Sequence, residues 1–257
     1  GFVARLNDTL VQRLLGWAES DLGKAPAPYA WVAFGSEGRM EQTLLTDQDN
    51  ALVYADEGAL RRDWFQALAE RVNADLQAAG FPECPGGCMA IKWNGTLSEW
   101  KKRFDDCIDE PRPQDAALFF DFRRVAGDLD LEPLEEVVAR AGRNPLLLRF
   151  MARNALEFTP PATVLLRLRS GSSTVDLKRQ GISPVVYMAR AYGLETGTRA
   201  RNTLERLEAA VKGGRMGENV FATVAEAYRF LLGLRLRLQL RMLAEGKPPV
   251  DQVALSD

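Results

Sequence analysis

The feature that most constrains the fold is segment 34–50, which reads Phe-Gly-Ser-Glu-Gly-Arg-Met-Glu-Gln-Thr-Leu-Leu-Thr-Asp-Gln-Asp-Asn and lies between two apolar runs. A Gly-Ser pair, Gly35 and Ser36, follows the first run, and Asp47 and Asp49 stand immediately before the second. Two short buried strands must therefore flank a small-residue turn and a pair of carboxylates. Such a turn lets a phosphate chain approach the backbone, and paired carboxylates bind Mg²⁺. The segment predicts a nucleoside triphosphate site.

The two carboxylates indicate a metal site. Asp47 and Asp49 stand two residues apart at the start of a predicted strand, so their side chains share one face. Adjacent carboxylates raise each other's pKa unless they share a cation. Mg²⁺ (or Mn²⁺) meets this need, because Mg²⁺ is bound by one or two carboxylates together with substrate phosphates. The alternative is a solvated turn, since Thr-Asp-Gln-Asp-Asn also suits turns. The Gly-Ser pair upstream favours the metal-site interpretation over the solvated turn.

The residues after the first strand are candidates for nucleotide binding. Gly35 and Ser36 precede a predicted short helix, where unpaired backbone N–H groups can receive phosphate oxygens. An ordinary helix cap is the alternative. Gly38 lies in the same nucleotide-binding turn, and Arg39 can neutralise phosphate charge. A surface ion pair between Arg39 and Glu41 is the alternative for that arginine.

The composition removes several classes of chemistry. The 257 residues include no histidine, which excludes imidazole bases, nucleophile–histidine pairs and imidazole metal sites. The net charge of −2 does not suggest a protein that coats nucleic acid, and no apolar run is long enough to span a membrane. Three cysteines, Cys84, Cys88 and Cys107, form no paired framework, which favours a reducing, cytoplasmic location. Cys84 and Cys88 have no further ligands at zinc spacing and are interpreted as buried or loop thiols rather than metal ligands.

Periodicity and turn residues predict an α/β (α+β) domain with a small mixed sheet, followed by an all-α helical bundle domain. We expect an N-terminal helix within 1–28, the mixed domain over 29–142 and the helical domain over 143–257. Strands are predicted at 29–35 and 49–55, with a third short strand over 86–92. Helices are predicted at 2–21, 36–42, 57–79, 96–108, 112–126, 131–141, 144–158, 183–195, 199–213 and 218–245. The chain begins with Gly1 rather than Met, and we expect further domains upstream.

The spacing of Gly-Ser, ten residues and Asp-x-Asp resembles the DNA polymerase β-like nucleotidyltransferase superfamily. The fuller segment resembles one branch of it, the nucleotidyltransferase domain with a helical substrate-binding domain found in bacterial signalling proteins behind cyclic-nucleotide-binding and CBS-pair domains. It is also similar to protein-PII uridylyltransferase and glutamine synthetase adenylyltransferase. Two further segments carry the resemblance: Ala-Leu-Phe-Phe-Asp-Phe-Arg-Arg-Val-Ala-Gly-Asp over 117–128 and Asp-Leu-Lys-Arg-Gln-Gly over 176–181.

The resemblance implies a role for each candidate residue. Asp47 and Asp49 would bind the catalytic Mg²⁺, Gly35 and Ser36 would hold the triphosphate, and Arg39 would support it. Lys178 would reach the phosphates from the second domain, although a lysine in a loop is also an ordinary solvated residue. The implied reaction transfers a nucleoside monophosphate to an acceptor hydroxyl, on the Tyr, Ser or Thr of a protein. Upstream sensor domains would control it in signal transduction.

One expected part of the site is missing from the sequence. Many members of the superfamily place a third carboxylate on the next strand, whereas segment 86–92 contains no acid. Glu83 and Asp121 are the candidates for a third acid, with Asp121 on a predicted helix. An active transferase is therefore the first hypothesis, and a nucleotide-binding regulatory module with little or no transferase activity is the second. A helical interaction domain with a fortuitous motif is the third.

Overall fold

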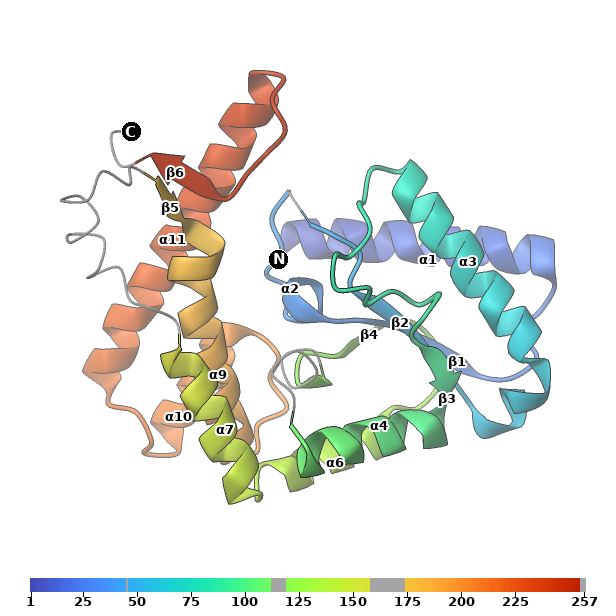
Figure 1. The fold of residues 1–257 in the computed structure, drawn as a ribbon, viewed down its shortest axis with the longest axis horizontal. Helices are drawn as coiled ribbons and strands as arrows, with labels where there is room; N and C mark the ends of the chain where they lie inside the picture. The colour runs from blue at the N-terminus through green and yellow to red at the C-terminus, as the bar shows by residue number, and fades with distance from the viewer. Residues whose placement is uncertain (45, 112–118, 158–173, 255–257) are drawn as a thin grey trace. The chain divides into compact units, whose positions relative to one another are not determined.

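The computed structural model describes residues 1–44, 46–111, 119–157 and 174–254 (Figure 1). These residues form two compact units. The first comprises Gly1–Gln42 and Thr46–Ala141, and the second comprises the described residues from Gly142 onward together with Thr43 and Leu44. No helix in these four ranges has the length and apolar character needed to cross a bilayer.

The first unit is built on a four-stranded mixed sheet, which confirms the predicted mixed α/β class. Its strand order is β3-β2-β1-β4. The central strand β1 pairs antiparallel with both β2 and β4, and β2 pairs parallel with β3. Every residue of β1 and β2 is buried, because helices cover both faces. The strands are β1 Tyr29–Ala33, β2 Asn50–Tyr54, β3 Asn94–Thr96 and β4 Arg123–Gly127.

Two pairs of helices cover the two faces of this sheet (Figure 1). On one face, Trp31 of β1 lines a small internal space with Val11 and Leu76, which belong to α1 and α3. On the opposite face, Phe34 stacks on Trp100 of α4, with ring centroids 6.0 Å apart. The helices are α1 Phe2–Leu22, α3 Arg62–Ala78, α4 Leu97–Asp109 and α6 Glu132–Ala141; the 3₁₀ segment Asp56–Arg61 leads into α3, and the short helix α2 Gly35–Gly38 follows β1.

The predicted helix over 112–126 is wrong over its last residues, although Phe119 is helical. Residues 112–118 lie outside the described residues, and Arg123–Gly127 is strand β4. Arg123 pairs with Ala33 and Arg124 with Val32, on a strand some ninety positions earlier in the chain. Strand propensity depends on such cross-strand neighbours, so a local pattern does not reveal it.

The third strand is also displaced from its predicted position over 86–92. That segment forms consecutive turns, in which the N–H of Met89 donates to Gly87 O at 3.0 Å and that of Lys92 to Met89 O at 2.8 Å. The strand that pairs with β2 comes later, at Asn94–Thr96. The apolar run before it reflects burial of Cys88–Ala90 rather than strand pairing.

The second unit is mainly helical, with a core that includes Ala189, Leu207 and Ala210. The helical character of this unit was predicted, but the unit is not all-α, because β5 and β6 form a two-stranded antiparallel sheet. A π-helical segment, Leu177–Ile182, follows β5. The remaining elements are α7 Pro145–Leu156, α9 Ser183–Thr196, α10 Thr203–Lys212, α11 Glu218–Ala244, β5 Thr174–Asp176 and β6 Gln252–Ala254.

Candidate functional site

The structure places Asp47 and Asp49 on one face of the chain just before β2. Thr46, Gln48 and Asn50 are buried, whereas the two aspartates between them are partly exposed. This alternation is the one expected of extended chain. Oxygen atoms of both carboxylates and the sulfur of Cys84 lie within 4.8 Å of one another. Among the described residues this is the group of three that could hold a metal ion.

A buried network of amide side chains holds the opposite face of the same segment. The Nδ2 atom of Asn73 in α3 donates to Gln48 Oε1 at 2.7 Å and to Asn50 Oδ1 at 2.9 Å. Asn50 Oδ1 also accepts from the N–H of Ala90, and Asn73 Oδ1 accepts from that of Ile91. Buried amides satisfied in this way fix the backbone that presents the two aspartates. This network was not predicted from the sequence, although a polar residue, Asn73, in the apolar stripe of α3 was a usable signal.

Gly35 brings the Gly-Ser turn against the second aspartate. The N–H of Phe34 donates to the carbonyl oxygen of Asp49 at 2.9 Å. Gly35 has φ of +55°, and a Cβ atom there would lie 2.9 Å from Asp49 Oδ2. The first N–H groups of α2 have no acceptor within the helix, and the side chain of the N-cap residue, Phe34, does not cap them. The turn and the carboxylate therefore meet as the spacing predicted, with Ser36 partly exposed beside them.

Gly38 has a packing role in this structure. It is buried at the end of α2, and a Cβ atom there would lie 1.8 Å from the carbonyl oxygen of Asp121. The backbone before β4 thus packs directly on α2, and no larger residue fits between them. A contact of Gly38 with a nucleotide stays a prediction.

Arg39 lies between two carboxylates inside the first unit. Its Nε donates to Glu41 Oε2 at 2.8 Å, and its Nη1 donates to the carboxylate of Asp121. The pair of Arg39 with Glu41 considered from the sequence is present, but it is buried rather than on the surface, with the two side chains 8% and 5% exposed. The side chain of Asp121 is 0% exposed. The pair of Arg39 with Asp121 ties the end of α2 to the chain that enters β4. A phosphate contact by Arg39 stays a prediction.

Neither candidate for the third acid belongs to the Asp47–Asp49–Cys84 cluster. Asp121 stands just before β4 rather than on a helix, and its carboxylate is paired with Arg39. Glu83 is exposed and lies in an isolated β-bridge opposite Gln48. The bridge brings the following residue, Cys84, to the aspartates instead.

Cys84 is a protonated neighbour of Asp49 in this structure. Burial, together with the hydrogen bond that its thiol donates to Asp49, raises the pKa of Cys84 to about 11. A thiol with such a pKa carries no charge near neutral pH, so it is a poor nucleophile. Its half-buried place in a loop fits the expected loop thiol, but no sequence pattern indicated its position beside Asp47 and Asp49.

Glu37 is a further acidic residue at the site that the sequence analysis missed. Burial raises its pKa to about 7; Arg123 opposes the rise, and the charges of Asp8, Asp49 and Asp47 add to it. Arg123 is itself held by Asp8 through two hydrogen bonds of 2.8 and 2.9 Å. A carboxyl group that loses its proton near pH 7 therefore stands on α2 within the field of the aspartate pair.

We expect Glu37→Gln to remove part of the pH dependence of stability. The pKa of Glu37 rises from 4.5 to about 7 on folding, so between these values the folded state keeps a proton that the unfolded state has lost. The free energy of unfolding should fall as pH rises through this window, by at most roughly 3 kcal/mol, because one pKa unit corresponds to 1.36 kcal/mol.

Urea unfolding at pH 5 and pH 8 with a chelator present would measure this difference. Glu37→Gln should show a smaller loss between the two pH values than the wild type. Glu57→Gln, at an exposed position, is the control and should follow the wild type. An unchanged loss in Glu37→Gln would contradict the expectation.

Lys178 lies in the second unit, on the π-helical segment after β5. Its side chain is exposed, and its carbonyl oxygen accepts a hydrogen bond from Ser183 Oγ at 2.8 Å. Its contact with a triphosphate stays a prediction.

Two protein-family models match the chain, one over each part. Residues 1–114 match the family model described as "Putative nucleotidyltransferase DUF294", and residues 145–257 match the "Putative nucleotidyltransferase substrate binding domain". The chain belongs to this nucleotidyltransferase family. The Gly-Ser turn and the aspartate pair lie within the nucleotidyltransferase match, and Lys178 lies within the substrate-binding match.

The nucleotidyltransferase chain is also similar to a curated enzyme, the bifunctional glutamine synthetase adenylyltransferase/adenylyl-removing enzyme of Ralstonia nicotianae. The two are 35% identical over 78 residues, which is 28% of this chain and 8% of that enzyme. The chain thus spans less than a tenth of the relative's length. The likeness supports nucleotidyl transfer chemistry, and the relative's full activity is a matter for proposal.

Proposed function

We propose that this protein is a Mg²⁺- or Mn²⁺-dependent transferase that moves a nucleoside monophosphate from a nucleoside triphosphate to an acceptor hydroxyl on a protein. The observation that carries the proposal is the close approach of Gly35 to Asp49, which puts the Gly-Ser turn (here called the phosphate turn) beside the carboxylate pair. Membership of the nucleotidyltransferase family supports the reaction class.

Different residues of the site would bind the metal ion and the phosphate chain. Asp47 and Asp49 would hold the metal ion, since their oxygens are the ligands Mg²⁺ prefers. The ion would supply positive charge to the phosphate oxygens in the transition state. Gly35 and the N–H groups at the start of α2 would bind the phosphate chain and orient its α-phosphorus. The acceptor oxygen then bonds to that phosphorus as the bond to the pyrophosphate oxygen breaks, and the hydroxyl proton passes to water.

A nucleotide-binding regulatory module with little or no transferase activity is the second candidate. It is favoured by one observation: Glu83 and Asp121 both lie outside the metal cluster. In that case the site would report nucleotide binding to other parts of a longer protein.

The wider setting is also proposed. Upstream sensor domains would control the transferase in cytoplasmic signal transduction in bacteria, as the resemblance to the CBS-associated branch implies. ATP is the first donor to test, because the similar curated enzyme is named as an adenylyltransferase.

The test uses the four nucleoside triphosphates labelled at the α-phosphate, incubated with the protein, Mg²⁺ or Mn²⁺, and proteins of a cell lysate. Transfer of label to a protein band supports the transferase. Metal-dependent nucleotide binding by calorimetry without any transfer favours the regulatory module. Absence of metal-dependent binding would overturn both.

A further inference from the structure

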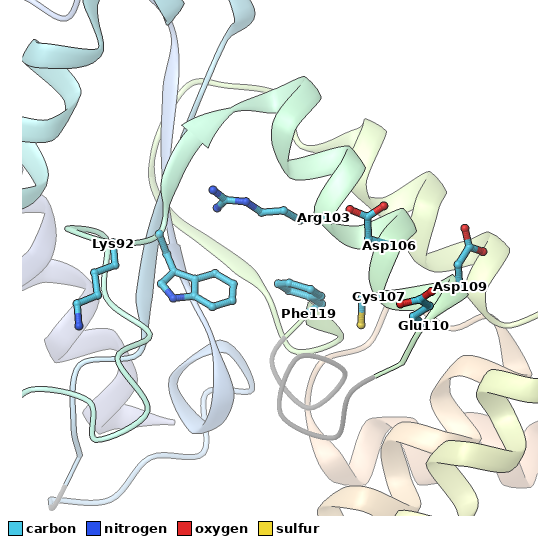
Figure 2. A pocket seen from close by; sticks show the side chains of 8 residues that line it. Lys92, Arg103, Asp106, Cys107, Asp109, Glu110 and Phe119 are labelled. Carbon is cyan, nitrogen blue, oxygen red and sulfur yellow. The ribbon is translucent and has the colours of Figure 1, made fainter.

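A second feature of the first unit is a cavity of about 640 Å³ beside α4, here called the aromatic cavity. Its size is that of a small-molecule site. Lining residues come from the chain around β3, from α4 and from the chain before β4. They are Lys92, Trp93, Arg103, Asp106, Cys107, Asp109, Glu110 and Phe119 (Figure 2).

The walls of the aromatic cavity suit a planar ring. The rings of Trp93 and Phe119 pack on each other, with centroids 5.8 Å apart and planes at 60°, and the partly exposed Trp93 offers its ring to the cavity. The guanidinium carbon of Arg103 stands 6.0 Å from the centroid of Trp93 and 5.0 Å from that of Trp100. Aromatic rings and a stacked arginine are the groups on which nucleobases stack.

The two ends of the aromatic cavity differ in charge. Figure 2 shows Lys92 at one end and the carboxylates of Asp109 and Glu110 at the other, with Phe119 between them. Both acids are exposed at the end of α4. A cation suits phosphate or ribose oxygens, and carboxylates accept hydrogen bonds from amino groups on the edge of a base.

The aromatic cavity opens on the same face of the sheet as the aspartate pair. The β1–β2 register sets Ala33 opposite Asn50, and Phe34 therefore stands opposite Asp49, to which its N–H is bonded. Opposed residues of antiparallel strands point to the same face. Phe34 stacks on Trp100, whose ring centroid lies 5.9 Å from that of Trp93 in the cavity wall.

A short segment of chain joins the two sites. Cys84 lies in the metal cluster, and the carbonyl of Trp93 accepts the N–H of Leu52 at 3.0 Å. Leu52 is three residues beyond Asp49, about 10 Å along an extended strand. The Nζ atom of Lys92 lies by the same segment, because it would be 3.5 Å from a Cβ atom placed on Gly87. The base and ribose of a nucleotide span such a distance when the phosphates are at the metal.

We propose that the aromatic cavity receives the nucleoside part of the donor nucleotide, and this inference rests on the proposed function. The partly exposed ring of Trp93 stacks on the base with Phe119 beside it in the wall, while Lys92 faces the ribose and phosphates. Asp109 and Glu110 favour bases with an exocyclic amino group (adenine, guanine or cytosine) over uracil. The cavity thereby sets nucleotide specificity, and the phosphate turn and metal supply binding that is common to all triphosphates.

The first test compares Mg²⁺-dependent binding of ATP and of inorganic tripolyphosphate by calorimetry. Trp93→Leu should weaken ATP binding about tenfold to a hundredfold, the range for loss of one base–aromatic stack, and leave tripolyphosphate binding unchanged. Trp17→Leu is the matched control, because Trp17 is 60% exposed on α1 at the other face. Equal weakening of both ligands, or of neither, would overturn the proposal. If the wild type binds neither ATP nor tripolyphosphate in the presence of Mg²⁺, the proposed function itself would be overturned.

A second variant decides the matter if Trp93→Leu fails to fold. Asp109→Asn with Glu110→Gln changes only exposed side chains, so the fold should persist. The variant should bind ATP, GTP and CTP several-fold more weakly and UTP as the wild type does. Unchanged affinity for all four nucleotides would overturn the proposal. A change only in which proteins receive label in the transfer assay, with no change in nucleotide affinity, would overturn it as well.

Discussion

Replacing Asp47 and Asp49 together by Asn is expected to abolish metal-dependent nucleotidyl transfer. The loss should reach about a thousandfold or more, since metal charge on the phosphate is worth several kcal/mol and each 1.36 kcal/mol is tenfold. Asparagine keeps the shape of aspartate and removes its negative charge, so the variant isolates the electrostatic role. Transfer from α-labelled triphosphate, and the rise in melting temperature caused by Mg²⁺ with nucleotide, would both be measured.

The same variant should be at least as stable as the wild type without metal. The two carboxylates lie within 4.8 Å of each other and repel when no cation is shared. The Mg²⁺-dependent stabilisation should vanish, because a ligand stabilises only a state that binds it. Asp63→Asn, on an exposed side chain of α3, is the control for charge alone. Glu83→Gln should retain transfer, since Glu83 is outside the cluster. Full transfer in the double Asn variant would contradict the metal assignment.

The core of this site could be predicted because its signals are local. Apolar runs on both sides of segment 34–50 specify two strands, and their pairing brings Gly35 to Asp49. Glycine at position 35 is also a local requirement, because its φ of +55° is rare for other residues. Spacing along one hairpin thus contains nearly all of the geometry of the Gly-Ser turn and the two carboxylates.

The surroundings of the site depend on contacts between distant parts of the chain. The amide network joins Gln48 and Asn50 to Asn73, and a bridge opposite Gln48 carries Cys84 to the aspartates. No periodic pattern marks these pairs, because each is made by one side chain in an irregular segment. Strand β4 escaped prediction for the same reason, since its partner β1 lies some ninety residues earlier. Asp121 was consequently expected on a helix rather than beside Arg39.

Removal of the Asp121 charge is expected to destabilise the first unit strongly. Asp121→Asn leaves the guanidinium of Arg39 buried without this counter-charge, and breaking a buried ion pair in this way costs roughly 3–5 kcal/mol. Glu41 remains at 2.8 Å from Arg39 and should keep the cost near the lower end. Urea unfolding at pH 7 would measure the loss. Arg62→Met, in the half-exposed pair with Glu99, is the matched control and should cost about 1 kcal/mol or less.

This variant also distinguishes a structural role of Asp121 from a catalytic one. A second variant, Arg39→Met with Asp121→Leu, removes both charges and should be less destabilised than the sum of the two single changes. If Asp121 serves only to hold α2 and β4 together, Asp121→Asn should still bind Mg²⁺ and triphosphate well below its melting temperature. Loss of transfer in Asp121→Asn with a stability change no larger than that of Arg62→Met would contradict the structural role. That outcome would make Asp121 the third acid, because its charge would then matter to the reaction and not to the fold.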